Sequence, residues 1–388
     1  MNVSLRSERA MVPSLAGAYS LCLYHLKYAV RKGKKMSDEY LGENLIFIIS
    51  QPRSGSTLLQ RMLSGNKDIK TSAETWLMLH PLYALRSEGI TTDYGARWAA
   101  LALNEFLDNY TDGASVHDSA VRSWAKVFYE NALEHGKGRI FIDKTPRYAM
   151  ILPELLRLFP KARFIFLLRN PMAVLYSELN SFVKDDFNML SEFRTDLLDT
   201  PEQILTGIRR LGDAAIIVRY ETLVTHPEVE MKRLCSQLDI EYCDAMLDYG
   251  STPAAKGFMT DRVGIGKRTR PVADSIDKWR GIAKDPQQLH FAQQYLMELD
   301  QDVLAGLGYD HDEMLAVIGT GKVDPRGLYP WRLAINRQDD FSMRDRYAHR
   351  RYRRRKEKGV VLGAIAAAYD LLRQTGRNLA KAYSRIPR

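Results

Sequence analysis

Apolar runs and stretches with helical spacing alternate along residues 37–310, and this alternation is typical of an α/β sheet. Four runs are short, apolar and bounded by polar turns, and we expect them to be strands: residues 45–49, 139–143, 163–168 and 214–218. An amphipathic helix at residues 151–159 joins the second strand to the third. Because a crossover helix of this kind joins parallel strands, the pattern predicts a central parallel sheet flanked by helices.

Helical spacing also predicts elements around this sheet. Further helices are expected from about residue 57 onward and at residues 91–135, 172–179, 227–238 and 287–307. The segment 250–280 is rich in Gly and Arg and is expected to be irregular.

The first predicted strand leads into a polar turn, residues 50–57 (SQPRSGST), and a helix follows. Backbone N–H groups at the start of such a helix favour an anion, as does the positive end of its dipole. Arg53 adds a cation to this turn. The turn lacks the second Gly and the Lys of a Walker A loop. An ordinary strand–turn–helix junction is the alternative for this turn alone.

Cationic residues follow two other predicted strands. Lys144 comes after the strand at 139–143, and Arg169 after the strand at 163–168, with Ser177 eight residues further on. Ligands of parallel sheets bind beyond the carboxyl ends of the strands, so we expect these side chains to meet near one anionic ligand. A guanidinium fork and a hydroxyl suit a phosphate group. A surface or helix-capping role is the alternative for Arg169 alone.

Residues 52–58 (PRSGSTL) resemble the 5′-phosphosulfate-binding loop of the sulfotransferases that use 3′-phosphoadenylyl sulfate (PAPS). Arg169 with Ser177 resembles the 3′-phosphate motif of that family, and residues 143–146 (DKTP) resemble its Lys-containing turn. The motifs occur in the order of the family over residues 44–281.

The resemblance implies a P-loop-like, three-layer sulfotransferase fold and a site for PAPS. The residues it assigns to PAPS are Arg53, Ser54, Gly55, Ser56, Thr57, Leu58, Arg169, Ser177, Tyr220 and Lys278, with Arg268 and Arg270 as further candidates. It also implies that Arg53 and Lys144 stabilise the transferred sulfuryl group, and that no metal is needed.

The resemblance assigns the general base to Glu74. Some family members use a His two residues after the strand-end Lys, but Pro146 occupies that position here. Residues 72–76 (SAETW) resemble instead the segment of the carbohydrate and tyrosylprotein members that use a Glu base. A carboxylate at a helix N-terminus is the alternative for Glu74. The weaker candidates are His80 and His117, and Asp143 is expected to orient Lys144.

The net charge of +9 is concentrated at the two ends of the chain. Residues 344–388 contain 14 Lys or Arg against 3 Asp or Glu, and residues 1–36 contain 7 against 1. We therefore predict a basic helical N-terminal arm at 1–36, a catalytic domain at 37–310, and a C-terminal extension with a basic amphipathic tail at 311–388.

The charge of the basic tail, residues 344–388, predicts one of two roles: attachment to an anionic membrane surface, or packing on the acidic body of the chain. That body is residues 37–343, which contain 43 Asp or Glu against 35 Lys or Arg. Three unpaired cysteines and the absence of a long apolar run predict a cytoplasmic protein, peripheral on the inner face of a membrane if the tail binds lipid. We expect no nucleic-acid partner, since no recognised binding motif is present.

The acceptor is expected to be a hydroxyl of a carbohydrate, a glycolipid or another small alcohol. Its pocket would come from the helical insertions at 76–135 and 181–210, whose aromatic residues are Trp76, Tyr83, Trp98, Phe182 and Phe187.

Two other functions are alternatives to sulfuryl transfer. A P-loop nucleotide kinase would need a Walker Lys and an acidic Mg²⁺ site, and a non-catalytic membrane tether would need none of the site residues.

Overall fold

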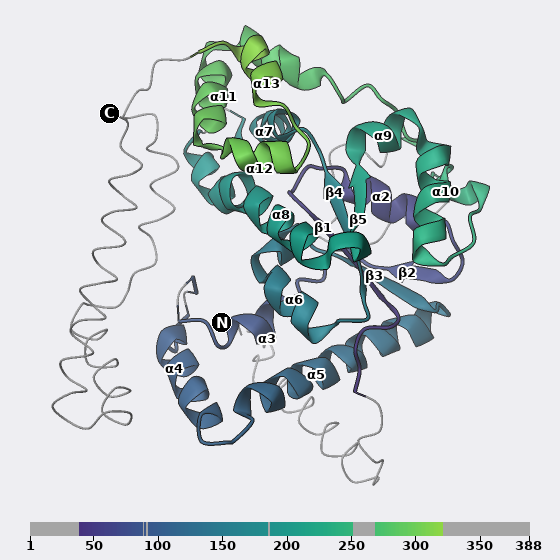
Figure 1. Ribbon diagram of the computed structural model, residues 1–388, viewed down its shortest axis with the longest axis vertical. Coiled ribbons are helices and arrows are strands. Elements are labelled where there is room, and N and C mark those ends of the chain that lie inside the picture. The colour runs from purple at the N-terminus through teal and green to yellow at the C-terminus, as the bar shows by residue number, and fades with distance from the viewer. Residues whose placement is uncertain (1–38, 88, 91, 185–186, 251–267, 321–388) are drawn as a thin grey trace, which may run out of the picture.

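The computed structural model describes residues 39–320 apart from 88, 91, 185–186 and 251–267. A five-stranded sheet lies at its centre, with the strand order β2-β3-β1-β4-β5 (Figure 1). All neighbouring strands are parallel. The strands are β1 (Leu45–Ser50), β2 (Ile69–Thr71), β3 (Ile140–Lys144), β4 (Arg163–Leu168) and β5 (Ile216–Arg219). The prediction of a central parallel sheet is confirmed.

Strand β2 was not expected from the sequence. It has three residues, and only Ile69 is buried, so no apolar run marks it. It pairs with β3 at the edge of the sheet, where Ile69 lies opposite Ile140. A strand this short is stabilised by its neighbour more than by its own sequence.

Two hydrophobic layers cover the sheet, and alternate residues of β1 belong to each. Leu45, Phe47 and Ile49 pack with α5 (Gly113–Gly136), α6 (Leu152–Leu158) and α8 (Thr200–Leu211). Ile46 and Ile48 pack with α2 (Ser56–Leu63), α9 (Tyr220–Thr225) and α10 (Pro227–Leu238). Because side chains alternate along a strand, this division produces three layers, as the resemblance implied.

A third hydrophobic cluster lies beyond β4 and is built by α7 (Pro171–Glu178), α11 (Pro286–Glu298), α12 (Gln301–Gly306) and α13 (His311–Ile318). The prediction of one helix over 287–307 is wrong. Helix α11 ends at Glu298, and the Asp300 carboxylate accepts hydrogen bonds from the backbone N–H groups of residues 302 and 303. An N-cap therefore starts a second helix, although the apolar spacing runs on across the break.

The remaining elements connect these layers. The predicted helical region at 91–135 consists of α4 (Ala96–Leu107) and α5, and α3 (Leu79–Tyr83) precedes them. Short 3₁₀ or π turns occupy Pro146–Ile151, Leu179–Val183, Phe187–Phe193, Thr195–Asp199, Gly212–Ala214, Asp244–Met246 and Lys278–Lys284.

The predicted basic arm at 1–36 and the tail at 344–388 lie outside the described residues. The boundary at residue 310 stays a prediction, although α13 packs in the third cluster. In the part of the chain that the structure describes, no helix is both long enough and apolar enough to cross a membrane.

Candidate active site

A cleft of about 800 Å³ lies beyond the carboxyl ends of the strands. Its wall includes Arg53 after β1, Pro146 after β3, Arg169 after β4 and Tyr220 after β5. Residues of the segment 268–279 complete the described wall. This is the edge at which parallel sheets bind their ligands, so the cleft is the candidate active site.

The turn after β1 has a backbone that only certain residues tolerate. Arg53 has φ +63°, and Gly55 has φ +91° and is the N-cap of α2. A Cβ atom on Gly55 would lie 2.5 Å from Cδ2 of the Tyr220 ring. Gly55 is therefore required both by its left-handed conformation and by the close approach of Tyr220.

The start of α2 offers donors to the cleft. The first N–H groups of an α-helix have no partner within the helix, and here Ser56, Thr57 and Leu58 line the cleft. Ser54 does not line it. The Ser54 hydroxyl is buried and has no hydrogen-bond partner among the described residues.

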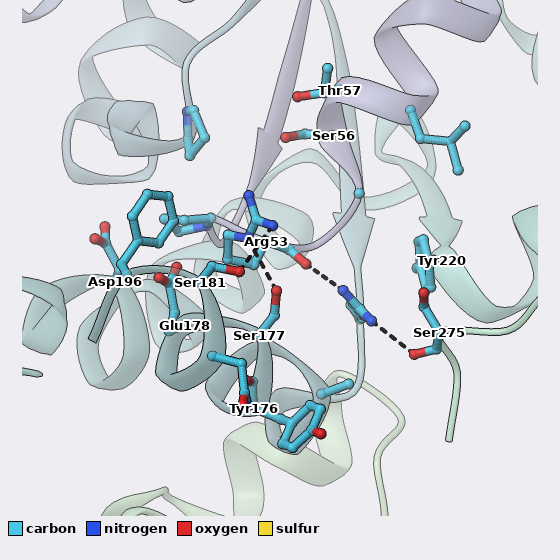
Figure 2. A pocket seen from close by; sticks show the side chains of 18 of the residues that line it. Arg53, Ser56, Thr57, Tyr176, Ser177, Glu178, Ser181, Asp196, Tyr220 and Ser275 are labelled. Atoms are coloured by element: carbon cyan, nitrogen blue, oxygen red, sulfur yellow. Dashed lines mark hydrogen bonds between the residues drawn. The ribbon is translucent and has the colours of Figure 1, made fainter. Parts of the chain in front are cut away.

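Arg53 lies against the end of α7 (Figure 2). Its Nε donates to Oγ of Ser177 at 3.1 Å, and its Nη2 lies 3.5 Å from Oγ of Ser181. The guanidinium also lies over the Phe182 ring, 5.4 Å from its centroid. Ser177 thus reaches the cleft beside Arg53.

Arg169 contacts three other parts of the cleft wall. Its Nη1 donates to the backbone oxygen of Arg53 at 2.6 Å, and its Nη2 to that of Ser275 at 3.0 Å. The guanidinium lies 4.3 Å from the centroid of the Tyr220 ring. Burial lowers the pKa of Arg169, and its Nε has no partner among the described residues. One donor of Arg169 is therefore unused.

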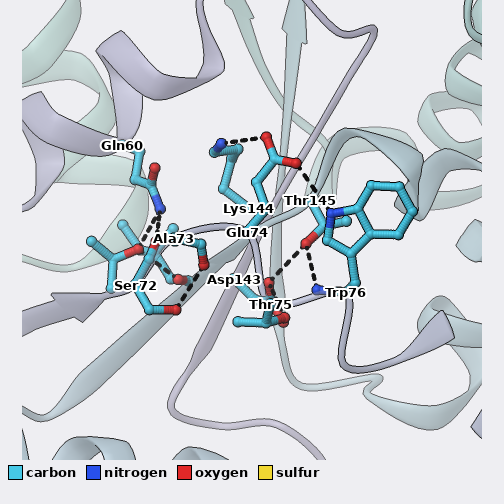
Figure 3. A network of polar contacts seen from close by, with 11 residues as sticks. Gln60, Ser72, Ala73, Glu74, Thr75, Trp76, Asp143, Lys144 and Thr145 are labelled. Atoms are coloured by element: carbon cyan, nitrogen blue, oxygen red, sulfur yellow. Dashed lines mark hydrogen bonds and ion pairs between the residues drawn. The ribbon is translucent and has the colours of Figure 1, made fainter. Parts of the chain in front are cut away.

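Glu74 and Lys144 form an ion pair (Figure 3). Lys144 Nζ lies 2.8 Å from Oε1 of Glu74, and Nε1 of Trp76 donates to Oε2 at 3.3 Å. The Lys144 side chain is 2% exposed and that of Glu74 is 19% exposed. Glu74 lines the cleft, whereas Lys144 lies behind it. Lys144 therefore meets the cleft through Glu74.

A buried carboxylate holds the segment that carries Glu74. Asp143 accepts hydrogen bonds from the hydroxyl groups of Tyr129 at 2.7 Å, Tyr148 at 2.9 Å and Thr75 at 2.9 Å. Burial raises the pKa of Asp143, and these hydroxyl bonds oppose the rise. The Tyr148 hydroxyl also accepts from the backbone N–H of Met78 at 3.1 Å. The network thus fixes residues 75–78 on the end of β3.

Asp143 does not act as the sequence suggested. Its oxygens bond hydroxyl groups, while Lys144 bonds Glu74. The prediction that Asp143 orients Lys144 is therefore wrong, because the two are consecutive residues of β3 and their side chains point to opposite faces of the sheet.

The late segment contributes two cations to the cleft wall, Arg268 and Lys278. Both pair with Asp274: Arg268 Nη2 lies 2.6 Å and Lys278 Nζ 3.5 Å from Oδ2. Arg270 is exposed and is not among the described wall residues.

A model of the sulfotransferase family matches residues 45–244, about half of the chain. The matched span contains the turn after β1, Glu74, Lys144, Arg169 and Tyr220. The chain belongs to the sulfotransferase family. It is therefore a transferase enzyme.

Known proteins resemble this sulfotransferase to different extents. Nodulation protein NoeE of Sinorhizobium fredii is 33% identical over 213 residues, which are 50% of this chain and 49% of that protein. The chain thus spans about half the length of NoeE. Protein-tyrosine sulfotransferase 1 of Danio rerio is 28% identical over 305 residues, 74% of this chain and 79% of that protein. The sulfotransferase domain from the curacin biosynthetic pathway has a TM-score of 0.47 at 23% identity, covering 68% of this chain and 97% of that domain.

Four further residues of the sulfotransferase cleft were not predicted from the sequence: Arg147, Glu178, Phe193 and Asp196. Arg147 Nη2 lies 2.7 Å from Oδ2 of Asp196. Burial raises the pKa of Asp196 to about 6, although Arg147 opposes the rise. Nothing in the spacing of these residues marks them, since Glu178 ends α7 and the other three come from separate helical turns.

Only some of the other residues predicted for the acceptor site or as the base line the cleft. Trp76 and Phe182 line the sulfotransferase cleft, whereas Tyr83, Trp98, His80 and His117 are not among its described wall residues. The side chain of Phe187 lies outside the described ones. Among the residues placed by the structure, no three His, Cys, Asp or Glu side chains are grouped closely enough to hold a metal ion.

Proposed function

We propose that the cleft transfers the sulfuryl group of PAPS to a hydroxyl of an acceptor. The observation that carries this proposal is the gathering of five cations, Arg53, Arg147, Arg169, Arg268 and Lys278, in one cleft that Glu74 also lines. PAPS carries anionic groups at both its 5′ and 3′ ends. Cations in two places suit such a molecule, here Arg53 for the 5′ end and Arg169 with Lys278 for the 3′ end. The buried, unpartnered Arg169 Nε and the Gly55 turn also fit a bound phosphate.

Three of these cations have a proposed part in holding the donor. Arg53 and the first N–H groups of α2 bind the 5′-phosphosulfate, while Ser54, Ser56, Thr57 and Leu58 shape that turn. Arg169, Ser177 and Lys278 bind the 3′-phosphate, and Tyr220 contacts the adenine. This part is supported by the position of Tyr220, which lines the cleft close to Gly55 and to the Arg169 guanidinium.

Glu74 is proposed as the general base. Its carboxylate takes the proton of the acceptor hydroxyl as that oxygen bonds to sulfur. The bond from sulfur to the bridging oxygen breaks, and its electron pair stays with the 5′-phosphate of adenosine 3′,5′-bisphosphate. Lys144, 2.8 Å from Glu74, holds the carboxylate ready and adds positive charge near the transferred oxygens. No step of this transfer uses a metal ion.

The acceptor is proposed to be a carbohydrate, glycolipid or other small alcohol. The cleft wall near Glu74 supports it, since Trp76, Phe182 and Phe193 offer aromatic faces beside polar groups. A tyrosine of a protein is a second candidate, because several relatives are named protein-tyrosine sulfotransferases.

We also propose the arrangement of the remaining chain: a basic arm at 1–36, a catalytic domain at 37–310, and an extension at 311–388 whose tail either binds an anionic membrane surface or packs on the acidic body. On this proposal the enzyme is cytoplasmic or peripheral on the inner face of a membrane, with no nucleic-acid partner.

The test is the release of adenosine 3′,5′-bisphosphate from PAPS in the presence of neutral sugars, a glycolipid, a simple alcohol or a tyrosine-containing peptide. We expect acceptor-dependent release with one of the first three and its loss in Glu74→Gln. Release only with the peptide would favour the second candidate. A chain that binds PAPS but transfers to none of the panel would contradict the proposed acceptor classes.

A further inference from the structure

Glu178 is a buried acid without a partner at the edge of the cleft. It is the last residue of α7 and directly follows Ser177. Its side chain lines the cleft, yet the residue is only 1% exposed. Neither carboxyl oxygen has a hydrogen-bond partner among the described residues. Burial raises the pKa of Glu178 to about 8, so the group is mostly neutral at pH 7.

Three charged groups face Glu178 from the elements packed around it. Arg53, in the turn after β1, acts most strongly and favours the ionised form. Asp196, in the helical turn Thr195–Asp199, opposes ionisation, and Arg147, after β3, favours it. Figure 2 shows Glu178 and Asp196 on the same side of the cleft as Arg53.

Arg53 rests on two residues close to Glu178 in the chain, Ser177 directly before it and Ser181 three residues after it. Its bonds to the hydroxyl groups of Ser177 and Ser181 place the guanidinium over the same turn of helix. A neutral Glu178 leaves the attraction of Arg53 for an anion in the cleft unchanged. An ionised Glu178 would add a negative charge next to Arg53, in a place where water screens poorly. The charge of this one carboxyl therefore affects the residue proposed to hold the 5′ end of the donor.

We propose that Glu178, an unpartnered carboxyl beside the serines that hold Arg53, is a positioning residue for Arg53: its neutral form leaves the guanidinium to the 5′-phosphosulfate of the donor, and its ionised form draws the guanidinium away. This inference rests on the proposed function, because it takes PAPS as the ligand of Arg53. It requires donor affinity to fall as pH rises through the titration of Glu178, since the anionic donor and the ionised carboxyl compete for one cation.

The size of the effect follows from the neutral fraction. At pH 9 a carboxyl that titrates near pH 8 is neutral in about one molecule in ten, and a ligand that needs the neutral form binds about tenfold more weakly than at pH 7. The phosphates of the probe lose their second proton near pH 6 and so keep their charge over this range.

The experiment is calorimetric titration of the full chain with adenosine 3′,5′-bisphosphate at pH 7, 8 and 9, repeated with adenosine 3′-phosphate, which lacks the group that faces Arg53. We expect the Kd of the bisphosphate to rise about tenfold from pH 7 to pH 9 and that of the 3′-phosphate to stay constant. In Glu178→Gln, which is neutral at every pH, the bisphosphate should keep its pH 7 affinity throughout. Glu228→Gln, an exposed Glu on α10 paired with Lys232, is the control and should behave as the wild type.

A pH dependence that persists in Glu178→Gln, or that the 3′-phosphate shares, would overturn the positioning role while leaving the proposed function intact. The comparison of the two probes tests the role in the wild type, so it does not depend on the variant being well folded. Failure of the bisphosphate to bind at any pH would overturn the proposed function and this inference with it.

Discussion

Glu74 is the single residue on which the proposed chemistry depends. Glu74→Gln keeps a side chain of the same shape, able to bond Lys144, but cannot take a proton. We expect kcat to fall at least about 100-fold and the affinity for adenosine 3′,5′-bisphosphate to change less than about twofold. Initial rates and calorimetry measure the two quantities. Glu154→Gln is the control, because Glu154 also forms an ion pair, with Arg86, but is not a described wall residue. Unchanged turnover in Glu74→Gln would exclude Glu74 as the general base.

Gly55 allows a second prediction at this scale, with Gly212 as a matched control. Both have positive φ, but a Cβ on Gly55 meets the Tyr220 ring, whereas one on Gly212 meets nothing within 4 Å. We expect Gly212→Ala to lower the free energy of unfolding by about 1 kcal/mol. Gly55→Ala should lower the free energy of unfolding by about 1–3 kcal/mol more than Gly212→Ala, because the Tyr220 ring must move. Urea denaturation measures both, and equal losses would show that the approach of Tyr220 does not constrain this turn.

Single residues were predictable from the sequence where a motif fixed them to a strand end. Arg53, Arg169 and Tyr220 follow strands that apolar runs marked, and the structure brings all three to one cleft. The pairing of Lys144 with Glu74 was not predictable, because 70 residues separate them and packing alone brings them together. Glu178 and Asp196 were missed for the same reason: burial, which gives them their unusual pKa values, comes from tertiary contacts.

At the scale of elements, the hydroxyl network on Asp143 joins the segment after β2 to the end of β3. Tyr129 and Tyr148 each donate one hydroxyl to this carboxylate, but only Tyr148 also bonds the backbone of Met78. Each Tyr→Phe change should lower the free energy of unfolding by about 1–3 kcal/mol, because a buried acceptor loses a donor.

Only Tyr148→Phe should also lower kcat, since it releases the segment that carries Glu74, and Tyr129→Phe serves as its control. Denaturation curves and initial rates measure the two effects. An equal loss of kcat in both variants would mean that the network acts through Asp143 alone and not through the segment.

Elements with long, regular apolar patterns were the predictable ones. Strand β4 and helix α10 have the predicted bounds, and β1 differs by one residue. The predictions failed where local hydrogen bonds, and not the spacing of apolar residues, decide the structure. Strand β2 forms because β3 offers it an edge, and the Asp300 cap divides α11 from α12 where the spacing alone predicts one helix.

At the scale of the whole molecule, two of the buried acids, Glu178 and Asp196, make stability depend on pH. Burial raises the pKa of Glu178 from 4.5 to about 8 and that of Asp196 from 3.8 to about 6. The folded state therefore keeps protons that the unfolded chain releases, and the free energy of unfolding contributed by these groups falls as pH rises through 4–8. Glu178→Gln removes its share of this dependence. As pH rises from 4.5 to 8, the free energy of unfolding of the variant should increase by a few kcal/mol relative to that of the wild type.

Urea denaturation of both proteins at pH 4.5, 6 and 8 measures this difference, with Glu228→Gln as an exposed control. Parallel pH profiles for the wild type and Glu178→Gln would show that Glu178 titrates normally in the folded state.

The central claim is that this cleft binds a nucleotide with phosphates at both its 5′ and 3′ ends. The most direct test is calorimetric titration with adenosine 3′,5′-bisphosphate and, separately, with ATP and Mg²⁺. We expect the bisphosphate to bind, and Arg169→Ala to weaken it by at least about tenfold through the loss of a charge-assisted contact. Arg163→Ala, at the opposite end of β4, should leave its affinity unchanged. Binding of ATP with Mg²⁺ in place of the bisphosphate would contradict the account and favour a nucleotide kinase.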